Sequence, residues 1–544
     1  MCKLFTIFSY TAMDVAQELM EQQIARQVPI HVATEKGGSE IQRFYDKANV
    51  FITGGTGFLG KQLIEKLLRS CNINKIYLLM RPKKGSSVKE RLANCLKDPV
   101  FDLLREKKPD FANHIIPVEG DIADLKLGLS DQDWSMLSQE VSVVFHVAAT
   151  TRFDEPLRVA TIYNVRGTRE LILLAKDCKN LKSFVHVSTA FCHATKSRAG
   201  GDVAETFYPC PVPPATMIDL VENVGDERLD KITNSLIEDW PNTYTFSKAI
   251  AEEAVRTLAE GLPVCIVRPP VVVAALIEPA PGWMDLSAVY GPTGVIVGIG
   301  MGVTHVSLNG DKHLAYMPVD LVNNACIAAG WDAAVRHKGG DREVIIHNVS
   351  TYRNQVTWGS ARQIMLSEET KCVYTPKAVW YCYMIETTNR AWHWILTWLL
   401  HYIPAYIVEG VIYVFGIKKP KGMPSLLKIY EKIYKMSIIY SHFLTNEWHF
   451  KDDNALNLIN KMSEQDKIIY NFDAATIDWK NLMWTWCLGC RKYIVKDGLK
   501  GTDYAQKKQF WLRIAHYIFM AVYLYAFIYI AYLFISIFMT FTKF

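Results

Sequence analysis

A glycine-rich turn between an apolar run and an amphipathic segment constrains this chain more than any other feature. Residues 50–52 form an apolar run typical of a buried parallel strand, and apolar residues recur at helical spacing from 59 to 68. A strand, a glycine turn and a helix in this order hold a dinucleotide pyrophosphate, because the glycines allow close backbone approach and the helix N-terminus offers free N–H groups. We therefore predict a dinucleotide site formed by Thr53, Gly54, Gly55, Thr56, Gly57, Phe58, Leu59 and Gly60.

The C-terminal segment has the composition of a membrane span. Residues 514–541 contain no Asp, Glu, Lys or Arg, and the stretch is longer than the ~20 residues that cross a bilayer. Lys507, Lys508 and Arg513 precede it, so the positive-inside tendency places most of the protein in the cytosol. A buried core helix is the alternative. We predict a single-pass transmembrane anchor at 514–541, after a juxtamembrane segment at 477–513.

The remaining composition argues against nucleic-acid binding and against a metal site. The chain has 544 residues, a net charge of +5 and no Lys/Arg-rich block, so we expect no nucleic-acid partner. Its 12 cysteines are scattered and follow no recognisable secretory leader, which favours reduced thiols facing the cytosol. Cys487 and Cys490 form the only CxxC pair and have no second pair of ligands. We therefore predict no metal.

Apolar runs that end in polar or small residues recur between residues 75 and 270. They alternate with helical segments and lie at 75–80, 114–122, 141–149, 184–190 and 264–270. This order predicts an α/β fold with a Rossmann-type, doubly wound parallel sheet, in which ligands bind at the carboxyl ends of the strands. The residues expected to line the cofactor there are Arg81, Lys83, Asp121, Ile122, Val147 and Ala148. Arg268 is expected near the substrate mouth.

The second strand indicates which dinucleotide is preferred. An NAD-preferring site places an acidic residue about 20 positions beyond the glycines to hold the ribose hydroxyls. This chain has Arg81, Lys83 and Lys84 at the comparable place, and no acid. A basic cluster accepts a 2′-phosphate, so NADPH is favoured; a solvated basic loop is the alternative.

Tyr244 and Lys248 form the predicted chemical centre. At positions i and i+4 of a helix the two side chains share a face, and an ammonium beside a phenol stabilises the phenolate. Tyr244 could then give its proton to a carbonyl oxygen as hydride reaches the carbon. The same spacing recurs at Tyr504 and Lys508, before the anchor, where we interpret it as coincidence. Of these two Tyr/Lys pairs, only Tyr244 and Lys248 lie between the fifth and sixth predicted strands.

Taken together, these motifs resemble the extended short-chain dehydrogenase/reductases, and among them the alcohol-forming fatty acyl-CoA reductases. The further segments that carry this resemblance lie at 41–45, 76–85, 164–168, 187–190, 278–283, 291–294 and 318–320. The resemblance runs from about residue 41 to 500. The chain departs from the family pattern at Leu286, at Pro270 and in the stretch around Met301, departures that bear on chain-length preference and coenzyme A binding.

The resemblance implies residue roles and a division of the chain. Tyr244 and Lys248 would carry catalysis, with Thr189 or Ser188 as the hydroxyl partner and Asn164 supporting the lysine. We expect an N-terminal extension at 1–46, an NADPH-binding catalytic domain at 47–370 and a mostly helical C-terminal domain at 371–476. Residues 392–417 are apolar but contain Glu409, which favours a membrane surface or an acyl-tunnel wall over a second span; a buried core hairpin is the third interpretation.

The predicted function is NADPH-dependent reduction of long-chain fatty acyl-CoA to a primary alcohol, with release of coenzyme A. Two alternatives stay open. One is a membrane reductase of the same fold that acts on sterols or stops at the aldehyde, and the other is a non-catalytic lipid-binding or scaffold relative. We expect a lipid membrane and an acyl-CoA as partners, and favour the endoplasmic reticulum over the peroxisome. The oligomeric state stays open, a homo-oligomer included.

Overall fold

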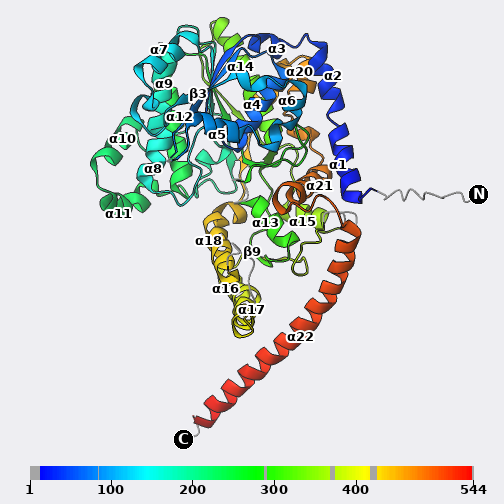
Figure 1. Ribbon diagram of the computed structural model, residues 1–544. Coiled ribbons are helices and arrows are strands. Elements are labelled where there is room, and N and C mark those ends of the chain that lie inside the picture. The colour runs from blue at the N-terminus through cyan, green and yellow to red at the C-terminus, as the bar shows by residue number, and fades with distance from the viewer. Residues whose placement is uncertain (1–12, 84, 287–290, 368–373, 417–424, 542–544) are drawn as a thin grey trace, which may run out of the picture.

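A seven-stranded parallel sheet forms the centre of the molecule (Figure 1). The computed structural model describes residues 13–83, 85–286, 291–367, 374–416 and 425–541. The strand order is β11-β7-β5-β4-β1-β2-β3, and every neighbouring pair is parallel. The strands are β1 (Asn49–Thr53), β2 (Lys75–Met80), β3 (Ile115–Glu119), β4 (Val143–His146), β5 (Ser183–Val187), β7 (Val264–Arg268) and β11 (Ile345–Asn348).

The chain winds away from β1 in both directions, which confirms the predicted doubly wound α/β fold. It runs β1, β2, β3 toward one edge, and then returns so that β4 pairs with the other side of β1. A ligand crevice is expected at this reversal, beyond the carboxyl ends of β1 and β4. The glycine turn follows β1 directly and therefore lies at that crevice.

Both faces of the sheet are buried. Val50 and Ile52 of β1 pack into one core with helices α4 (Phe58–Ser70) and α14 (Val319–Lys338). Phe51 points the other way, into a second core with Leu137, Leu171 and Val255. These three residues come from helices α7 (Asp131–Glu140), α9 (Gly167–Asp177) and α12 (Thr243–Leu258). The strands consist mostly of apolar residues because a parallel sheet covered on both faces has no solvated side.

Smaller elements complete this body. The short helices are α5 (Val88–Cys95), α6 (Asp102–Lys107), α8 (Leu157–Thr161), α10 (Pro214–Asn223) and α11 (Asp226–Ile237). Three two-stranded parallel pairs are β8 (Val271–Val273) with β10 (Tyr316–Pro318), β9 (Val306–Leu308) with β12 (Ile385–Thr387), and β6 (Asp202–Val203) with β13 (His449–Phe450).

The two ends of the chain pack against this body. The N-terminal helices are α1 (Val15–Ala25), α2 (Val28–Lys36) and α3 (Glu40–Tyr45). The buried Tyr45 hydroxyl donates to the carbonyl of Ile327 in α14 at 2.9 Å. Residues 477–513, expected as a juxtamembrane segment, include α21 (Trp479–Gly489), whose Trp486 is buried against Tyr316. A stretch that reads as membrane-proximal is therefore part of the folded core.

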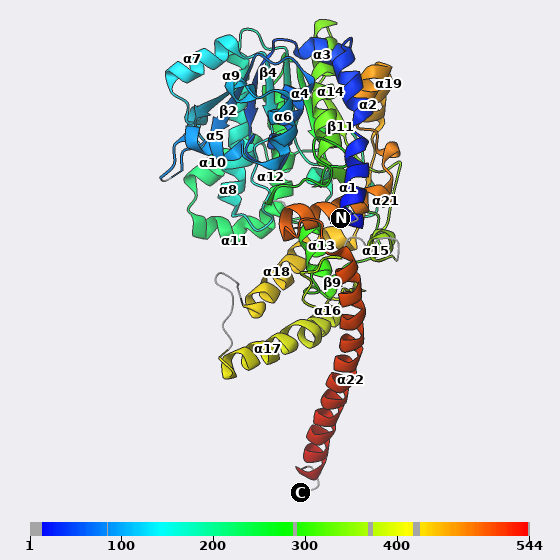
Figure 2. The same ribbon diagram turned by 45° about the vertical axis from the view of Figure 1, so that its right-hand side comes forward.

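The C-terminal helices divide between the body and the opposite end of the molecule. Helices α19 (Asp453–Lys461) and α20 (Glu464–Ile469) return to the sheet domain, where they contact α14 and α2. The helices at the far end are α13 (Pro292–Gly300), α15 (Trp358–Leu366), α16 (Arg390–Thr397), α17 (Ile403–Val414) and α18 (Leu426–Thr445). From this end α22 (Thr502–Phe541) projects away as one long helix (Figures 1 and 2). Two helical stretches, Arg390–Val414 and Thr502–Ile537, are long and apolar enough to cross a membrane.

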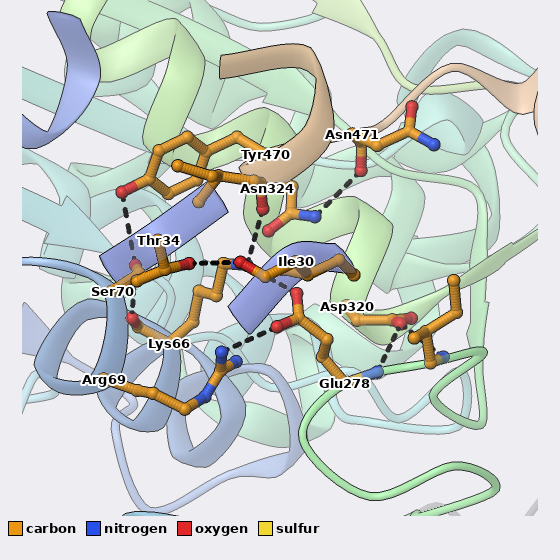
Figure 3. A network of polar contacts seen from close by, with 12 residues as sticks. Ile30, Thr34, Lys66, Arg69, Ser70, Glu278, Asp320, Asn324, Tyr470 and Asn471 are labelled. Atoms are coloured by element: carbon orange, nitrogen blue, oxygen red, sulfur yellow. Dashed lines mark hydrogen bonds and ion pairs between the residues drawn. The ribbon is translucent and has the colours of Figure 1, made fainter. Parts of the chain in front are cut away.

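A buried carboxylate joins three parts of the chain that lie far apart in sequence (Figure 3). Glu278 accepts a hydrogen bond from Lys66 at 2.5 Å and forms an ion pair with Arg69 at 2.6 Å, both in α4, and its side chain is 2% exposed. Lys66 also donates to the carbonyl of Ile469 in α20 at 2.6 Å. Asp320 of α14 accepts the backbone N–H of Glu278 at 3.0 Å. The helix that follows the glycine turn is thus fixed to the C-terminal region.

This network predicts an acid-sensitive contribution to stability. Burial works to raise the pKa of Glu278, but the charges of Arg69 and Lys66 outweigh it and lower the pKa to about 2. A carboxyl whose pKa is depressed in the folded state stabilises above its unfolded value and loses that contribution as pH falls through the folded value. The free energy of unfolding should therefore differ between wild type and Glu278→Gln at pH 6, and the difference should shrink at pH 3. Urea unfolding at both pH values measures this, and an equal difference at both would contradict it.

Candidate active site

The turn after β1 has no room for side chains at Gly54 and Gly60. Gly54 has φ +76°, and a Cβ there would lie 2.6 Å from the backbone nitrogen of Ala148. A Cβ on Gly60 would collide with the carbonyl oxygen of Gly54. Helix α4 then begins after Gly57, whose place at the N-cap provides no side-chain acceptor, so the first N–H groups of the helix stay available to an anion. This cradle fits the pyrophosphate of a dinucleotide.

A chain of buried hydrogen bonds supports the cradle from below. The Ala148 N–H donates to the Thr53 hydroxyl at 3.3 Å, and Thr53 contacts Nδ1 of His146 at 2.8 Å. Nε2 of His146 contacts the Thr168 hydroxyl at 2.9 Å, and Thr168 donates to the carbonyl of Asn164 at 2.7 Å. Because the Thr168 proton is already committed, we assign the proton of His146 to Nε2. Burial lowers the pKa of His146 well below its ordinary value, so this histidine stays neutral.

The predicted cofactor residues beyond the glycine turn lie at the ends of the neighbouring strands. Arg81 follows β2; its guanidinium donates to the Tyr163 hydroxyl at 3.2 Å and lies 3.9 Å from the Asp121 carboxylate. Its side chain is 61% exposed. Lys83 is exposed beside it, whereas Lys84 lies outside the described residues. Ile122 contacts Gly167 at the start of α9, where a Cβ would not fit. The strand ends therefore gather an exposed cation and a carboxylate at one edge.

Tyr244 and Lys248 lie in the first turns of α12, against the carboxyl end of β5. The Asn242 side chain caps this helix by accepting the N–H of Thr245 at 2.9 Å. The Tyr244 hydroxyl lies close enough to the Thr189 side chain for that hydroxyl to affect its pKa, and Nζ of Lys248 donates to the carbonyl of Val187 at 2.9 Å. Both groups thus reach the strand that ends in the predicted hydroxyl residues.

Burial controls the protonation of this pair. It raises the pKa of Tyr244 above its ordinary value, and the hydrogen bond from Thr189 opposes this only in part. It lowers the pKa of Lys248 to about 8, against the opposing charge of Glu252. At neutral pH Tyr244 therefore carries its proton and Lys248 its charge. A protonated phenol and an ammonium therefore lie one helical turn apart on α12, the spacing expected of a proton donor and a supporting cation.

The remaining candidate residues, Ser188, Thr189 and Asn164, lie in different surroundings. Successive residues of a strand point to opposite sides: Thr189 meets the Tyr244 hydroxyl, whereas Ser188 is buried on the side of the Cys192 thiol. Asn164 lies in a π-helical turn, Ile162–Arg166. Its side chain contacts the backbone of Thr150 and donates to the Ser247 hydroxyl at 2.9 Å. Among the described contacts, Asn164 makes no hydrogen bond to Lys248. It fixes the loop after β4 to α12.

Arg268 does not lie near a substrate mouth, as the sequence led us to expect. It is fully buried behind α12, where Nε and Nη2 donate to the two carboxylate oxygens of Glu252 at 2.8 and 2.6 Å. Cys192 donates its thiol to the same carboxylate at 3.2 Å, and His193 lies 3.7 Å away. The guanidinium occupies both carboxylate oxygens, so this cluster already contains its cation. Glu252 continues the Tyr244–Lys248 spacing by one turn, and that periodicity is the signal by which it could have been found.

An aromatic cluster connects Tyr244 to the C-terminal region. Phe153 stacks on the Tyr244 ring, with centroids 5.8 Å apart and an interplanar angle of 19°. Tyr440 and Phe443 of α18 each lie 5.1 Å from Phe153, and Phe443 also meets Phe191. Nothing in the sequence placed α18 against the sheet domain, because these contacts join residues nearly 300 positions apart.

The fold and this site define a reductase of the nicotinamide-dependent kind. A glycine cradle at the reversal of a doubly wound sheet binds a dinucleotide, and a Tyr/Lys pair one helical turn apart faces the neighbouring strand end. Within the parts of the chain that the structure describes, no second site combines these features.

Comparison with known proteins gives the family. Residues 52–326 and 400–497 match two family models, each described as "Male sterility protein", the first of them an NAD-binding domain. The chain is 38% identical to Fatty acyl-CoA reductase wat of Drosophila melanogaster over 494 residues, which cover 90% of this chain and 93% of that protein. It is 34% identical to human Fatty acyl-CoA reductase 1 over 89% of this chain and 91% of that protein. The chain belongs to the fatty acyl-CoA reductase family.

A solved structure supports the fold independently. The terminal R domain of the myxalamid biosynthetic pathway aligns with a TM-score of 0.54 and 19% identity, covering 82% of this chain and 91% of that domain. At this level of identity the likeness concerns the fold alone. It agrees with the parallel sheet and the helical C-terminal region.

The close packing at Gly60 predicts how a glycine-to-alanine substitution there affects dinucleotide binding. Gly60→Ala should weaken dinucleotide binding about 10- to 100-fold, because the new Cβ meets the Gly54 carbonyl and such overpacking costs about 1–3 kcal/mol. Gly225→Ala is the matched control, since a Cβ there meets nothing within 4 Å. Fluorescence titration with NADPH measures both. Equal affinities for the two variants would contradict the assigned cradle.

Proposed function

We propose that this protein reduces long-chain fatty acyl-CoA to primary fatty alcohol with NADPH, and releases coenzyme A. The placement of the Tyr244 hydroxyl beside Thr189, at the carboxyl end of β5, carries this proposal. It sets a proton donor and a carbonyl-orienting hydroxyl beside the cradle of the predicted dinucleotide. Family membership supports the choice of an acyl-CoA as substrate.

The chain's own groups have distinct tasks in this chemistry. When bound, the reduced nicotinamide supplies hydride. Thr189 orients the carbonyl oxygen of the thioester, and Tyr244 gives its proton to that oxygen as negative charge develops there. Lys248 stabilises the phenolate that Tyr244 becomes, and it does so below about pH 8, where it is charged. The covering aromatic residues Phe153 and Phe443 exclude water from the exchange.

Reduction of a thioester to an alcohol is a four-electron change, so it consumes two hydride equivalents. The first yields the aldehyde once the carbon–sulfur bond breaks and coenzyme A leaves as the thiol. The second reduces the aldehyde at the same Tyr244. The two steps require the same proton donor, and no cysteine nucleophile enters either of them.

The preference for NADPH is proposed from Arg81 and Lys83 at the end of β2. Arg81→Gln should weaken NADPH binding about 10- to 100-fold, since a charge-assisted hydrogen bond contributes about 1.5–3 kcal/mol. NADH, which has no 2′-phosphate, should bind equally to both forms. Lys97→Gln removes an exposed cation elsewhere on the surface and serves as the control. Loss of NADPH and NADH affinity in parallel would contradict the assignment.

We further propose that α22 anchors the protein in a membrane with the sheet domain in the cytosol. Residues 514–541 are free of Asp, Glu, Lys and Arg, and the most apolar stretch of α22 within Thr502–Ile537 has no buried residue. An anchor suits a substrate whose acyl chain partitions into lipid. The endoplasmic reticulum stays our prediction for the membrane concerned.

A substrate series tests this function. Membranes that contain the full chain are incubated with NADPH and acyl-CoAs of increasing chain length, and alcohols and aldehydes are quantified by mass spectrometry. We expect alcohols from long-chain substrates. Aldehyde as the only product would replace the proposal by an aldehyde-forming reductase, and absence of NADPH oxidation with every acyl-CoA would overturn it.

A further inference from the structure

Two helices at the far end of the molecule expose more apolar surface than a soluble domain retains. We define the arm as residues Arg390–Val414, which comprise α16, the π-helical turn Trp398–Tyr402 and α17. In both views the arm and α22 project from the same end, away from the sheet (Figures 1 and 2). Its exposed large apolar residues are Trp392, Trp394, Ile395, Trp398, Tyr406, Ile407, Val408, Val411, Tyr413 and Val414.

The pattern of these residues is that of a membrane interface. Tryptophan and tyrosine concentrate at the boundary between lipid and water, because their rings are apolar and their N–H or O–H groups are polar. Trp392 and Trp394 lie in α16, nearer the body, and the aliphatic residues gather in α17, farther along the chain. An apolar patch of this extent marks an interaction surface in a folded protein.

Glu409, the only acidic residue of the arm, has a hydrogen-bond partner within the protein. Glu409 accepts the backbone N–H of Leu426 at 2.7 Å, at the start of α18. A carboxylate at a helix N-terminus is stabilised by the free N–H groups and by the helix dipole. The residue that argued against a second membrane span therefore has a structural partner inside the protein.

A hydrogen bond between the arm and α22 fixes the position of the arm along the length of α22. The Tyr523 hydroxyl of α22 donates to the carbonyl of Leu399 at 3.0 Å. Pro404, five residues after Leu399, has no N–H with which a π-helical turn could satisfy that carbonyl. Tyr523 lies nine residues beyond Ile514, where the uncharged stretch begins, which is about 14 Å along the helix axis.

The length of α22 locates the membrane surface near this contact. Residues 514–541 extend about 42 Å as a helix, whereas the hydrocarbon core is about 30 Å thick. The surplus is taken up by the first turns, where His516 and Phe519 pack against Trp380 of the body. Residues 524–541 alone span about 27 Å. The surface then lies level with Tyr523 and Leu399, and α17 continues from that level.

We propose that the arm is a second membrane contact, with its tryptophans at the lipid–water boundary and α17 among the acyl chains of one leaflet. It lies in the leaflet without crossing it, as interfacial helices do. The occupant of the apolar face is the bilayer, because α22 carries the same surface into the membrane. This inference rests on the anchoring role proposed for α22.

The arm is also connected to the active site. Helix α18 begins at Leu426, which Glu409 holds, and Tyr440 and Phe443 near its end cover Phe153 and the catalytic tyrosine. If the arm contacts the membrane, the side of the active site that Phe153, Tyr440 and Phe443 cover faces the bilayer. An acyl chain dissolved in lipid would approach from that side.

Photocrosslinking from three tyrosine positions tests the proposal. p-Benzoylphenylalanine replaces Tyr413 in the arm, Tyr525 in α22 or Tyr504 before the uncharged stretch; these side chains are 88%, 71% and 61% exposed. Each full-length variant is reconstituted into phosphatidylcholine vesicles that contain radiolabelled lipid, and irradiated. We expect several-fold more lipid adduct at positions 413 and 525 than at 504. No step depends on catalysis, so the result is independent of the reductase assignment.

Each of the other possible outcomes would overturn the proposal. Adduct at 525 with none above the level of 504 at 413 would overturn the arm and leave the anchor standing. No adduct at 525 would overturn the anchor and with it this inference. A crosslink from 413 to a second copy of the chain in place of lipid would assign the apolar face to a protein interface and overturn the proposal.

Discussion

Tyr244→Phe is expected to lower the rate of acyl-CoA reduction by about 10²- to 10⁴-fold, the range in which a positioned proton donor contributes. The phenol is the group that meets the Thr189 hydroxyl at the end of β5, and its proton is retained at neutral pH because burial raises its pKa. Phenylalanine keeps the ring that stacks on Phe153. The variant should therefore fold and should bind NADPH as wild type does.

Tyr440→Phe is the matched control for this variant. Tyr440 belongs to the same aromatic cluster and also contacts Phe153, and the substitution removes the same kind of hydroxyl from a residue that has no contact with Thr189 among the described contacts. We expect its activity to stay close to that of wild type. NADPH oxidation and alcohol formation measure the rates, and fluorescence titration measures cofactor binding. Near-normal turnover of Tyr244→Phe, or an equal loss in Tyr440→Phe, would show that the proton comes from elsewhere.

Glu252→Gln is expected to lower the free energy of unfolding by about 3–5 kcal/mol, the cost of removing one partner from a buried ion pair. The carboxylate is fully buried, and both of its oxygens accept from Arg268. Burial alone would raise the pKa of Glu252. The positive charge of Arg268 outweighs burial, so the pKa lies well below its ordinary value. Glutamine leaves the buried cation without a counter-charge.

The neighbouring residue provides the control. Glu253 forms an ion pair with Arg256 at 2.6 Å, but the arginine is half exposed, so Glu253→Gln should cost less than about 1 kcal/mol. Urea unfolding in detergent compares the two variants. Equal effects would contradict the assigned burial of the Glu252 pair.

A second effect of Glu252→Gln concerns the lysine. The carboxylate raises the pKa of Lys248, which burial lowers to about 8. Without it the ammonium should lose its proton at lower pH, and the alkaline fall of activity should move to lower pH in step. A purely structural role of Glu252 would leave the pH profile in place, so the profile separates the two roles.

The sheet and the glycine turn could be predicted because both depend on local patterns. Apolar runs of strand length and glycines at fixed spacing are properties of neighbouring residues, and β1 to β5 and β7 lie where these patterns placed them. Tyr244 and Lys248 could be paired for the same reason, since helix geometry joins positions four apart. The comparison with known proteins then gave the family, which these local patterns alone do not establish.

Contacts between distant segments account for what the sequence did not reveal. Arg268 ends a strand at the ligand-binding edge, but the side chain turns toward Glu252, and strand position does not determine that direction. Helix α21 has few charges because it is buried in the core, although its composition resembles that of a membrane-proximal segment. Phe153 lies in a loop without periodicity, so nothing local indicated that it would stack on Tyr244.

The stoichiometry of the reaction tests the proposed chemistry most directly. Purified full-length protein in vesicles is given palmitoyl-CoA and limiting NADPH, and NADPH consumed, free coenzyme A thiol and hexadecanol are measured in the same sample. We predict two NADPH and one thiol for each alcohol. One NADPH for each thiol with aldehyde accumulating, or NADPH consumption without thiol release, would contradict reduction to the alcohol at a single site centred on Tyr244.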